Sequence, residues 1–244
     1  MGVIVSVYVG NRWPDTGRTV TDRTVAGCLI RQNGMVKYTT AVARLGQVAG
    51  DFADHASSRD DSIIVEAHVF GDLVTGPDTV EVIWLALVVD FPVEEVTWLA
   101  RPAQAEATAK MLRFDKYPLR WWWRPTVWPV WNHTISRPVR FWSKSHGPDE
   151  EALRLLADRR VNELVIQGPA DRGAYREQLQ TELEASRRHL DRLVNSYHDR
   201  DWRRDHKGFG VYPEDHLWWA TQGFLELDDA LRSSDEPNPP SATS

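Results

Sequence analysis

Tryptophan is concentrated in one short segment of the chain. Six of the twelve tryptophans lie between residues 121 and 142, and three of them are consecutive at 121–123. Because tryptophan has a very large apolar ring surface, such a segment has to pack against something. Prolines at positions 118, 125, 129 and 138 exclude an ordinary helix across it. We therefore expect residues 121–133 to be an extended ribbon, called here the Trp ribbon.

Two roles fit the Trp ribbon: packing between two layers of the fold, or forming the wall of a ligand site. Packing is favoured because large aromatic side chains dominate core burial, and it predicts that Trp128 and Trp131 are buried. Partial exposure is expected within residues 121–123, because consecutive residues of a strand point to opposite faces. The ligand-site alternative assigns the rings and the flanking polar groups to the ligand: Trp121, Trp122, Trp123, Arg124 and His133.

Bulk composition narrows the classes of function. The net charge is −6, and binding of nucleic-acid phosphates requires a basic surface, so no nucleic-acid partner is expected. The single cysteine, Cys28, excludes an internal disulfide and a cysteine-based zinc site, and it fits a reducing compartment. The most apolar run, residues 80–89, is too short to span a bilayer. The expectation is a cytoplasmic protein without a membrane partner.

The pattern of apolar residues predicts an α/β (or α+β) fold, in which a small mixed sheet packs on a C-terminal helical bundle. Residues 1–34 are expected to be a poorly ordered or additional N-terminal segment. Residues 35–167 are expected to form the α/β domain, residues 168–232 the helical bundle and residues 233–244 a disordered tail. The Trp ribbon should lie at the junction of the two domains.

Periodicity and turn residues place the individual elements. The expected helices are residues 38–52, 103–112, 148–159 and 175–197, and a last one that begins at Pro213. The expected strands are residues 63–70, 80–89, 135–142 and 161–166. Nearly continuous apolar character makes residues 80–89 a central strand buried on both faces. Pro138 makes residues 135–142 an edge strand.

The order of helix, strand ending in Gly71-Asp72, turn and apolar strand resembles the nucleotidyltransferase superfamily. That family places a Gly-Ser pair after the first strand to hold a phosphate. It also places two acids, two residues apart on a later strand, to bind two metal ions. Here Asp72 stands at the serine position, and Thr79 with Glu81 stands at the acidic pair. The resemblance implies a nucleotidyltransferase-like domain that has lost its metal site.

Two functions of different classes follow. The first is a non-catalytic binding or interaction protein with an unidentified protein or small-molecule partner, without metal or cofactor. Gly71, Trp202 and His206 would join the Trp ribbon as its binding residues. The alternative is a divergent nucleotidyltransferase that acts on a small molecule or RNA and requires Mg²⁺. Its catalytic, metal-holding candidates are Asp72, Glu81 and Asp90.

A third function, ranked below both, is that of a helical ribonuclease. Arg192 and His198 are expected on one long helix, and they resemble the Arg/His pair of helical ribonucleases that accompany minimal nucleotidyltransferases. The chain is rich in arginine, so a chance pairing is the better explanation.

Longer motifs resemble a family of uncharacterised bacterial proteins that carry a domain of unknown function. The matching stretches are residues 35–42, 69–71, 128–133 and 201–210. They are longer and more specific than the nucleotidyltransferase pattern. This resemblance implies no activity.

Overall fold

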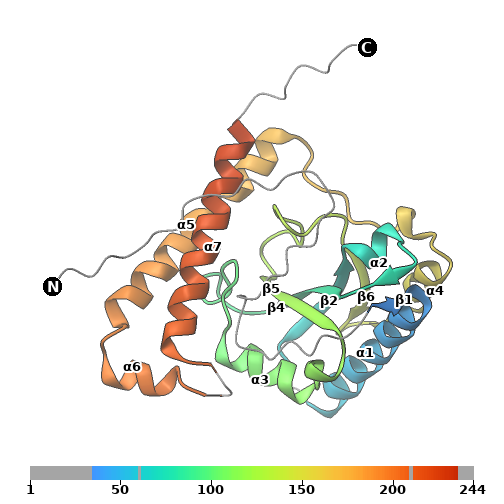
Figure 1. Ribbon diagram of the computed structural model, residues 1–244, viewed down its shortest axis with the longest axis horizontal. Coiled ribbons are helices and arrows are strands. Elements are labelled where there is room, and N and C mark those ends of the chain that lie inside the picture. The colour runs from blue at the N-terminus through green and yellow to red at the C-terminus, as the bar shows by residue number, and fades with distance from the viewer. Residues whose placement is uncertain (1–34, 60–61, 209–210, 236–244) are drawn as a thin grey trace.

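The computed structural model describes residues 35–59, 62–208 and 211–235 of the chain. A five-stranded sheet carries helices on both of its faces, and a long helical hairpin ends the described chain (Figure 1). The predicted class, a small mixed sheet with C-terminal helices, is confirmed. The expectations for residues 1–34 and 236–244 lie outside the described residues.

The sheet has the strand order β5-β4-β2-β6-β7. β4 runs parallel to β5 and antiparallel to β2, and β6 is antiparallel to both of its neighbours. The strands are β2 (Ile64–Phe70), β4 (Ile83–Val89), β5 (Leu119–Pro125), β6 (Val139–Ser143) and β7 (Gly147–Pro148). β4 is central, as predicted, because its side chains alternate between two cores: Leu85 and Leu87 lie in the first, and Ala86 lies in the second.

Helices α1 (Tyr38–Ser58) and α4 (Glu150–Ala157) cover the first face of the sheet. α1 is held there because its apolar residues recur every three or four positions and form one buried stripe. The stripe consists of Tyr38, Ala41, Val42, Leu45, Val48, Ala49 and Phe52. On the same side, α3 (Ala103–Met111) and the 3-10 turn η1 (Phe114–Lys116) contact β5 through Trp123 and Trp121.

The second face of the sheet packs on an antiparallel hairpin of α5 (Arg172–Ser196) and α7 (Pro213–Asp235), with the short α6 (Arg200–Asp205) between them (Figure 1). The Arg172 guanidinium donates to the backbone oxygen of Ser234, so the start of α5 lies beside the end of α7. The second core joins the sheet to this hairpin and contains Phe70, Ala86, Trp98, Leu99, Ile135, Leu179, Trp219 and Leu227. The predicted helical bundle is therefore a two-helix hairpin.

A tight turn follows β2 at Gly71. The residue has a left-handed φ of 71°, and a β-carbon there would lie 3.1 Å from Cδ1 of Trp84. Glycine is therefore required at this position by both the backbone and the packing. The chain then forms the four-residue α2 (Asp72–Thr75), and β3 (Thr79–Val80) pairs with β1 (Val36–Lys37) in a separate two-stranded sheet.

Two strand predictions were wrong in part or in whole. Residues 161–166 form a 3-10 turn, η2 (Val161–Glu163), rather than a strand, because their apolar side chains pack onto the first core while β7 already pairs with β6. β6 is not an edge strand, since it lies between β2 and β7. Pro138 precedes β6, so the ring removes no donor from its hydrogen-bonded ladder.

Other boundaries also differ from those predicted: β6 begins at Val139 and α1 continues to Ser58. Pro148 belongs to β7, and α4 begins at Glu150 because the Asp149 side chain caps it by accepting from the Ala152 N–H at 2.9 Å. Residues 200–205 of the expected charged connection are helical, as α6. The expected tail starts later than residue 233, because α7 continues to Asp235.

Candidate functional site

The first part of the Trp ribbon is β5, the edge strand that lies parallel to β4. Trp121 and Trp123 face the first core and Trp122 faces the second, as the alternation of a strand requires. Trp123 is buried, whereas Trp121 and Trp122 are half-buried, so the predicted partial exposure of this trio is confirmed.

The second part of the Trp ribbon is a loop between β5 and β6. Trp128 and Trp131 are only half-buried, so the prediction that both are buried was wrong. Each of the two rings packs against a side chain at the surface of the core and is not enclosed between the sheet and the helices. Trp128 lies under the Arg124 guanidinium, 5.6 Å from its ring centroid, and Trp131 lies 6.3 Å from the ring of Tyr175 on α5.

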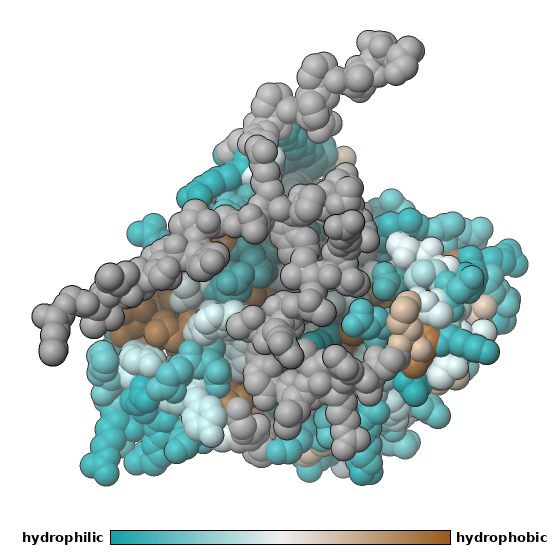
Figure 2. All heavy atoms as spheres, viewed as in Figure 1, coloured by the Kyte–Doolittle hydropathy of each residue, from teal (hydrophilic) through white to brown (hydrophobic). Residues whose placement is uncertain are grey.

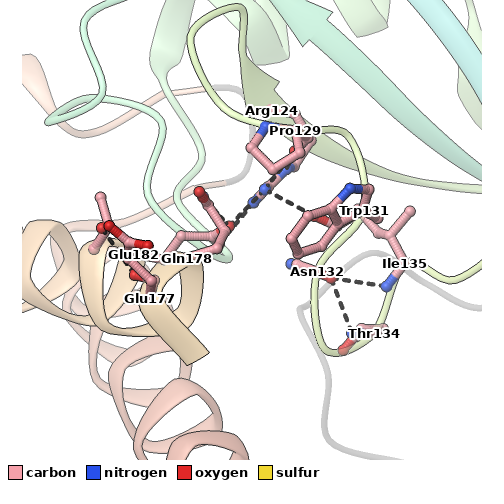
Figure 3. Close-up of polar contacts among 10 residues, drawn as sticks. Arg124, Pro129, Trp131, Asn132, Thr134, Ile135, Glu177, Gln178 and Glu182 are labelled. Atoms are coloured by element: carbon pink, nitrogen blue, oxygen red, sulfur yellow. Dashed lines mark hydrogen bonds and ion pairs between the residues drawn. The ribbon is translucent and has the colours of Figure 1, made fainter. Parts of the chain in front are cut away.

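Arg124 fastens this loop to the hairpin. Its guanidinium and the Glu182 carboxylate form a two-point ion pair with nitrogen–oxygen distances of 2.8 and 2.6 Å, and both side chains are fully buried (Figure 3). The same guanidinium donates to the backbone oxygens of Pro129, at 2.7 Å, and Trp131, at 3.3 Å. Gln178 donates to Glu182 at 2.9 Å. Arg124, expected to orient a ligand, therefore holds β5, the loop and α5 together.

Arg101, from the segment after β4, occupies the ring surface that the sequence offered to a ligand. Its guanidinium carbon lies 5.5, 5.4 and 5.5 Å from the ring centroids of Trp121, Trp122 and Trp219. Glu106 of α3 accepts from Arg101 at 3.1 Å and from the Trp123 indole N–H at 2.8 Å. Three aromatic faces around one cation are the arrangement that also binds cationic ligands. In this structure the cation belongs to the chain itself.

Several of the predicted binding residues are connected by a series of packing, ring and cation–π contacts. Gly71 touches Trp84, which stacks on Trp122 at 6.0 Å. From Trp122 the series continues through Arg101 to the hairpin. The contacts that follow join Trp219 to His216 at 5.7 Å, His216 to His206 at 5.2 Å and His206 to Trp202 at 4.1 Å. The structure thus brings Gly71, the Trp ribbon and α6 into one contact network, with several side chains between its ends.

His133, the other expected ligand-orienting group, lies under the ring of Trp98. The two ring centroids are 5.0 Å apart and nearly perpendicular. Its Nε2 is 4.0 Å from Oε2 of Glu226 on α7, which is beyond hydrogen-bond range, whereas the Trp98 indole N–H donates to the same oxygen at 2.7 Å. His133 therefore packs at the junction of the loop, the segment after β4 and α7.

Two histidines of the hairpin, His189 and His216, have pKa values well below the ordinary value of histidine. Burial lowers the pKa of His189 to about 4, although its hydrogen bond to the Glu94 backbone oxygen, at 2.9 Å, opposes the shift. Burial, and then the neighbouring His206, lower the pKa of His216 to about 4. Both imidazoles are therefore neutral near pH 7, so Nδ1 of His189 is the donor to Glu94.

The three carboxylates expected at a metal site do not converge. Asp72 follows β2 and Glu81 precedes β4, so both lie at one end of the sheet because these strands are antiparallel. Asp90 follows β4 and lies at the opposite end. All three are exposed. Within residues 35–59, 62–208 and 211–235, no group of three histidine, cysteine, aspartate or glutamate side chains is placed to hold a metal ion.

Sequence reasoning missed Arg101, Glu182 and Glu226. One signal was present: Glu182 lies among the apolar positions of α5, next to Leu179, and an acid on an apolar stripe usually has a buried partner. Arg101 gave no such signal, because its ring partners lie on two distant elements.

The surface offers few apolar features in the view of Figure 2. Most described atoms there are hydrophilic, and a group of hydrophobic atoms lies over α5. Val194 of α5 is exposed, as are Trp218 and Leu225 of α7. In the described part of the chain, no helix has both the length and the apolar character needed to cross a membrane.

Fold and junction together define a mixed α/β protein whose sheet is fastened to a C-terminal helical hairpin by buried arginine and tryptophan contacts. The chain belongs to the family described as "Domain of unknown function (DUF7711)", whose model matches residues 36–233. The search of curated proteins and the search of solved structures both found no match.

Proposed function

We propose that this chain is a non-catalytic binding protein on a nucleotidyltransferase-like scaffold. The observation that carries the proposal is the separation of its acids by β4. A seven-residue strand is about 20 Å long, whereas two catalytic metal ions lie about 4 Å apart. Asp90 therefore cannot complete a metal pair with Asp72 and Glu81. In the nucleotidyltransferase superfamily, the first acid of the metal-binding pair would stand at position 79, where this chain has Thr79.

The contacts of the Trp ribbon are structural and argue against a catalytic role for it. Its two arginine contacts are internal: Arg124 pairs with Glu182, and Arg101 fills the space between three rings. A partner, either a protein or a small molecule, would bind to a preformed surface that has no catalytic groups. The composition supports a cytoplasmic protein that does not bind nucleic acid, since it has one cysteine and a net charge of −6. A bacterial source rests only on the resemblance of its longer motifs to uncharacterised bacterial proteins.

The test is a nucleotidyl-transfer assay with each of the four ribonucleoside triphosphates, in Mg²⁺ and separately in Mn²⁺. The proposal predicts that no triphosphate is consumed above the rate without protein. The matched control is Glu81→Ala, which removes the acid at the family's metal position. Turnover that is present in the natural sequence and lost in Glu81→Ala would contradict the proposal.

The alternative is a divergent nucleotidyltransferase that uses Mg²⁺. It is supported by the position of Asp72 and Glu81, which lie exposed at the same end of the sheet. Titration with Mg²⁺ and ATP should then change the tryptophan fluorescence, because Trp84 lies directly behind Gly71. An unchanged spectrum at millimolar concentrations of both would leave this alternative without support.

The ribonuclease function stays below both. Arg192 donates to the backbone oxygen of Glu94 at 2.7 Å, which gives it a structural partner. His198 was expected on the same long helix, but α5 ends at Ser196.

A further inference from the structure

A cavity opens at the C-terminal end of α2, whereas the turn at Gly71 precedes the first residue of this helix. The cavity has a volume of about 250 Å³ and lies between the end of α2, the loop before β6 and the chain after α4. Its lining includes three buried residues, Tyr38, Val74 and Val161. The exposed lining residues are polar: Thr75, Arg137, Arg159 and Asn162. Polar groups at the rim of a small cavity can hold a small molecule, with the buried apolar residues below them.

Both arginines of this cavity have left-handed backbones. Their φ angles are 51° for Arg137 and 59° for Arg159. Among the described residues, two further non-glycine residues have a positive φ: Leu99 and Arg113. A long side chain is strained in this conformation, which glycine adopts freely. Backbone strain of this kind collects at ligand sites, where the side chain has a use that offsets it. At Arg159 the left-handed residue also ends α4, because the Arg159 N–H donates to the Leu156 oxygen and the Arg160 N–H to the Leu155 oxygen. Arg137 lies at no helix end, and both arginines line one cavity.

Each guanidinium is positioned by the chain. Arg159 lies over the ring of Tyr38, 4.4 Å from its centroid, and donates to the backbone oxygen of Gly76 and, at 3.0 Å, to Asp78. The Asp78 side chain is 95% exposed, so a ligand can compete with it for the cation. Arg137 donates from Nη2 to Oδ1 of Asn162 at 2.6 Å. That bond leaves the other donors of the Arg137 fork and the Asn162 amide N–H₂ for a ligand.

We propose that this Arg137/Arg159 cavity binds the phosphate group of a small phosphate monoester. Two guanidiniums and the Asn162 amide supply several donors at one cavity, which suits the three terminal oxygens of a dianion. A carboxylate has one charge and two oxygens, and a single guanidinium fork satisfies it. The volume is below the range of drug-sized ligand pockets, so the organic part of the ester is small and lies on the buried apolar residues.

This proposal deepens the proposed binding function by naming a ligand class. It is tested without metal ions and without nucleotides. If phosphate does not bind, only the cavity proposal fails, and the result of the nucleotidyl-transfer assay still stands. If nucleotidyl transfer is detected, the proposed function fails, and the titration with phosphate still decides the cavity proposal.

The experiment is isothermal titration of the full chain with inorganic phosphate, glycerol 3-phosphate and acetate at matched ionic strength and pH. We expect both phosphate compounds to bind and acetate to bind at least about tenfold more weakly, as one charge-assisted contact is lost. Glycerol 3-phosphate should bind at least as tightly as inorganic phosphate, because its carbon chain reaches the buried apolar residues.

The decisive variants exploit the backbone strain. Arg137→Gly removes a guanidinium and relieves the left-handed φ, so it should weaken phosphate binding about tenfold or more while the denaturant midpoint stays the same or rises. Arg113→Gly is the matched control, because it relieves a φ of 56° at a residue that does not line the cavity. It should leave phosphate binding unchanged.

Three outcomes would overturn the proposal. They are no binding of either phosphate compound at millimolar concentration, acetate binding as tight as phosphate binding, and equal loss of binding in Arg113→Gly and Arg137→Gly. Arg159→Gly should also lose binding. If that variant fails to fold because its contact with Tyr38 is lost, Arg137→Gly decides the result.

Discussion

Gly223 of α7 packs directly against the backbone of Trp98, so closely that a β-carbon at position 223 would lie 2.2 Å from the Trp98 carbonyl oxygen. Glycine inside a helix normally costs about 1 kcal/mol relative to alanine. Its presence here lets α7 approach the segment after β4, where Trp98 is buried in the second core.

Gly223→Ala is therefore expected to destabilise the protein by about 1–3 kcal/mol, because the obstructing atom is backbone and the helix has to move away. Gly46→Ala in α1 is the matched control, since a β-carbon there meets nothing within 4 Å. It should stabilise the protein by about 0.5–1 kcal/mol. Urea unfolding followed by circular dichroism measures both. Equal effects of the same sign would contradict the close packing of α7.

The second prediction concerns the buried pair Arg124–Glu182. Glu182→Gln leaves a buried guanidinium without its counter-charge and should cost about 3–5 kcal/mol. Glu184→Gln, on an exposed position of α5, should change the unfolding free energy by less than about 0.5 kcal/mol. The double variant Arg124→Met/Glu182→Leu should recover much of the loss, since replacing a whole buried pair by apolar groups is often neutral. Denaturant midpoints of Arg124→Met, Glu182→Leu and the double variant complete the double-mutant cycle, and additive costs of the two single substitutions would exclude a coupled pair.

The elements that the sequence predicted well are those whose signal is local. The stripe of α1 repeats every three or four residues, and β4 is a continuous apolar run, so each pattern is contained in the element itself. Residues 161–166 carried an equally apolar pattern, but their outcome depended on β7, which occupies the neighbouring edge of the sheet. A short apolar segment does not specify whether an edge is available to it.

The candidate site was predictable only in part, for a related reason. The crowding of tryptophan located the junction, and alternation along β5 placed Trp122 opposite Trp121 and Trp123. The cation between the rings came from Arg101, and Arg124 found its partner 58 residues away. Such pairings depend on how the hairpin docks on the sheet, which no local pattern records.

The third prediction is a loss of stability in mild acid. Burial disfavours the charged imidazole and lowers the pKa of His189 in the folded chain to about 4, from the ordinary value of 6.5 that applies to the unfolded chain. As the pH falls, His189 is therefore protonated in the unfolded chain at a higher pH than in the folded chain. The contribution of neutral His189 is complete above about pH 6.5 and falls by up to about 1.4 kcal/mol per pH unit as the pH drops toward 4.

Urea unfolding of His189→Asn and of the natural sequence at pH 7.5, 6 and 5 measures this effect. The difference in unfolding free energy between the two should shrink as the pH falls, because the natural sequence alone loses the contribution. His198→Asn, at an exposed position beyond α5, is the control and should keep a constant difference. Parallel pH profiles for His189→Asn and the natural sequence would mean that His189 titrates alike in both states.

The last prediction separates the two parts of the Trp ribbon. Trp123 is 3% exposed in the first core, and its indole N–H donates to Glu106 at 2.8 Å. Trp123→Ala should therefore cost about 3–5 kcal/mol, as large-to-small core substitutions do. Trp131 is half-buried and lies against Tyr175, so Trp131→Ala should cost less than half as much.

Circular dichroism during urea unfolding is the suitable measurement for this comparison, because other tryptophans dominate the fluorescence signal. Equal costs for the two substitutions would mean that the loop of the Trp ribbon is as much a part of the core as β5. A small cost for Trp131→Ala has a further consequence. The loop's position then rests on the buried bonds from Arg124 to the backbone oxygens of Pro129 and Trp131, so Arg124→Met should release the loop when Trp131→Ala does not.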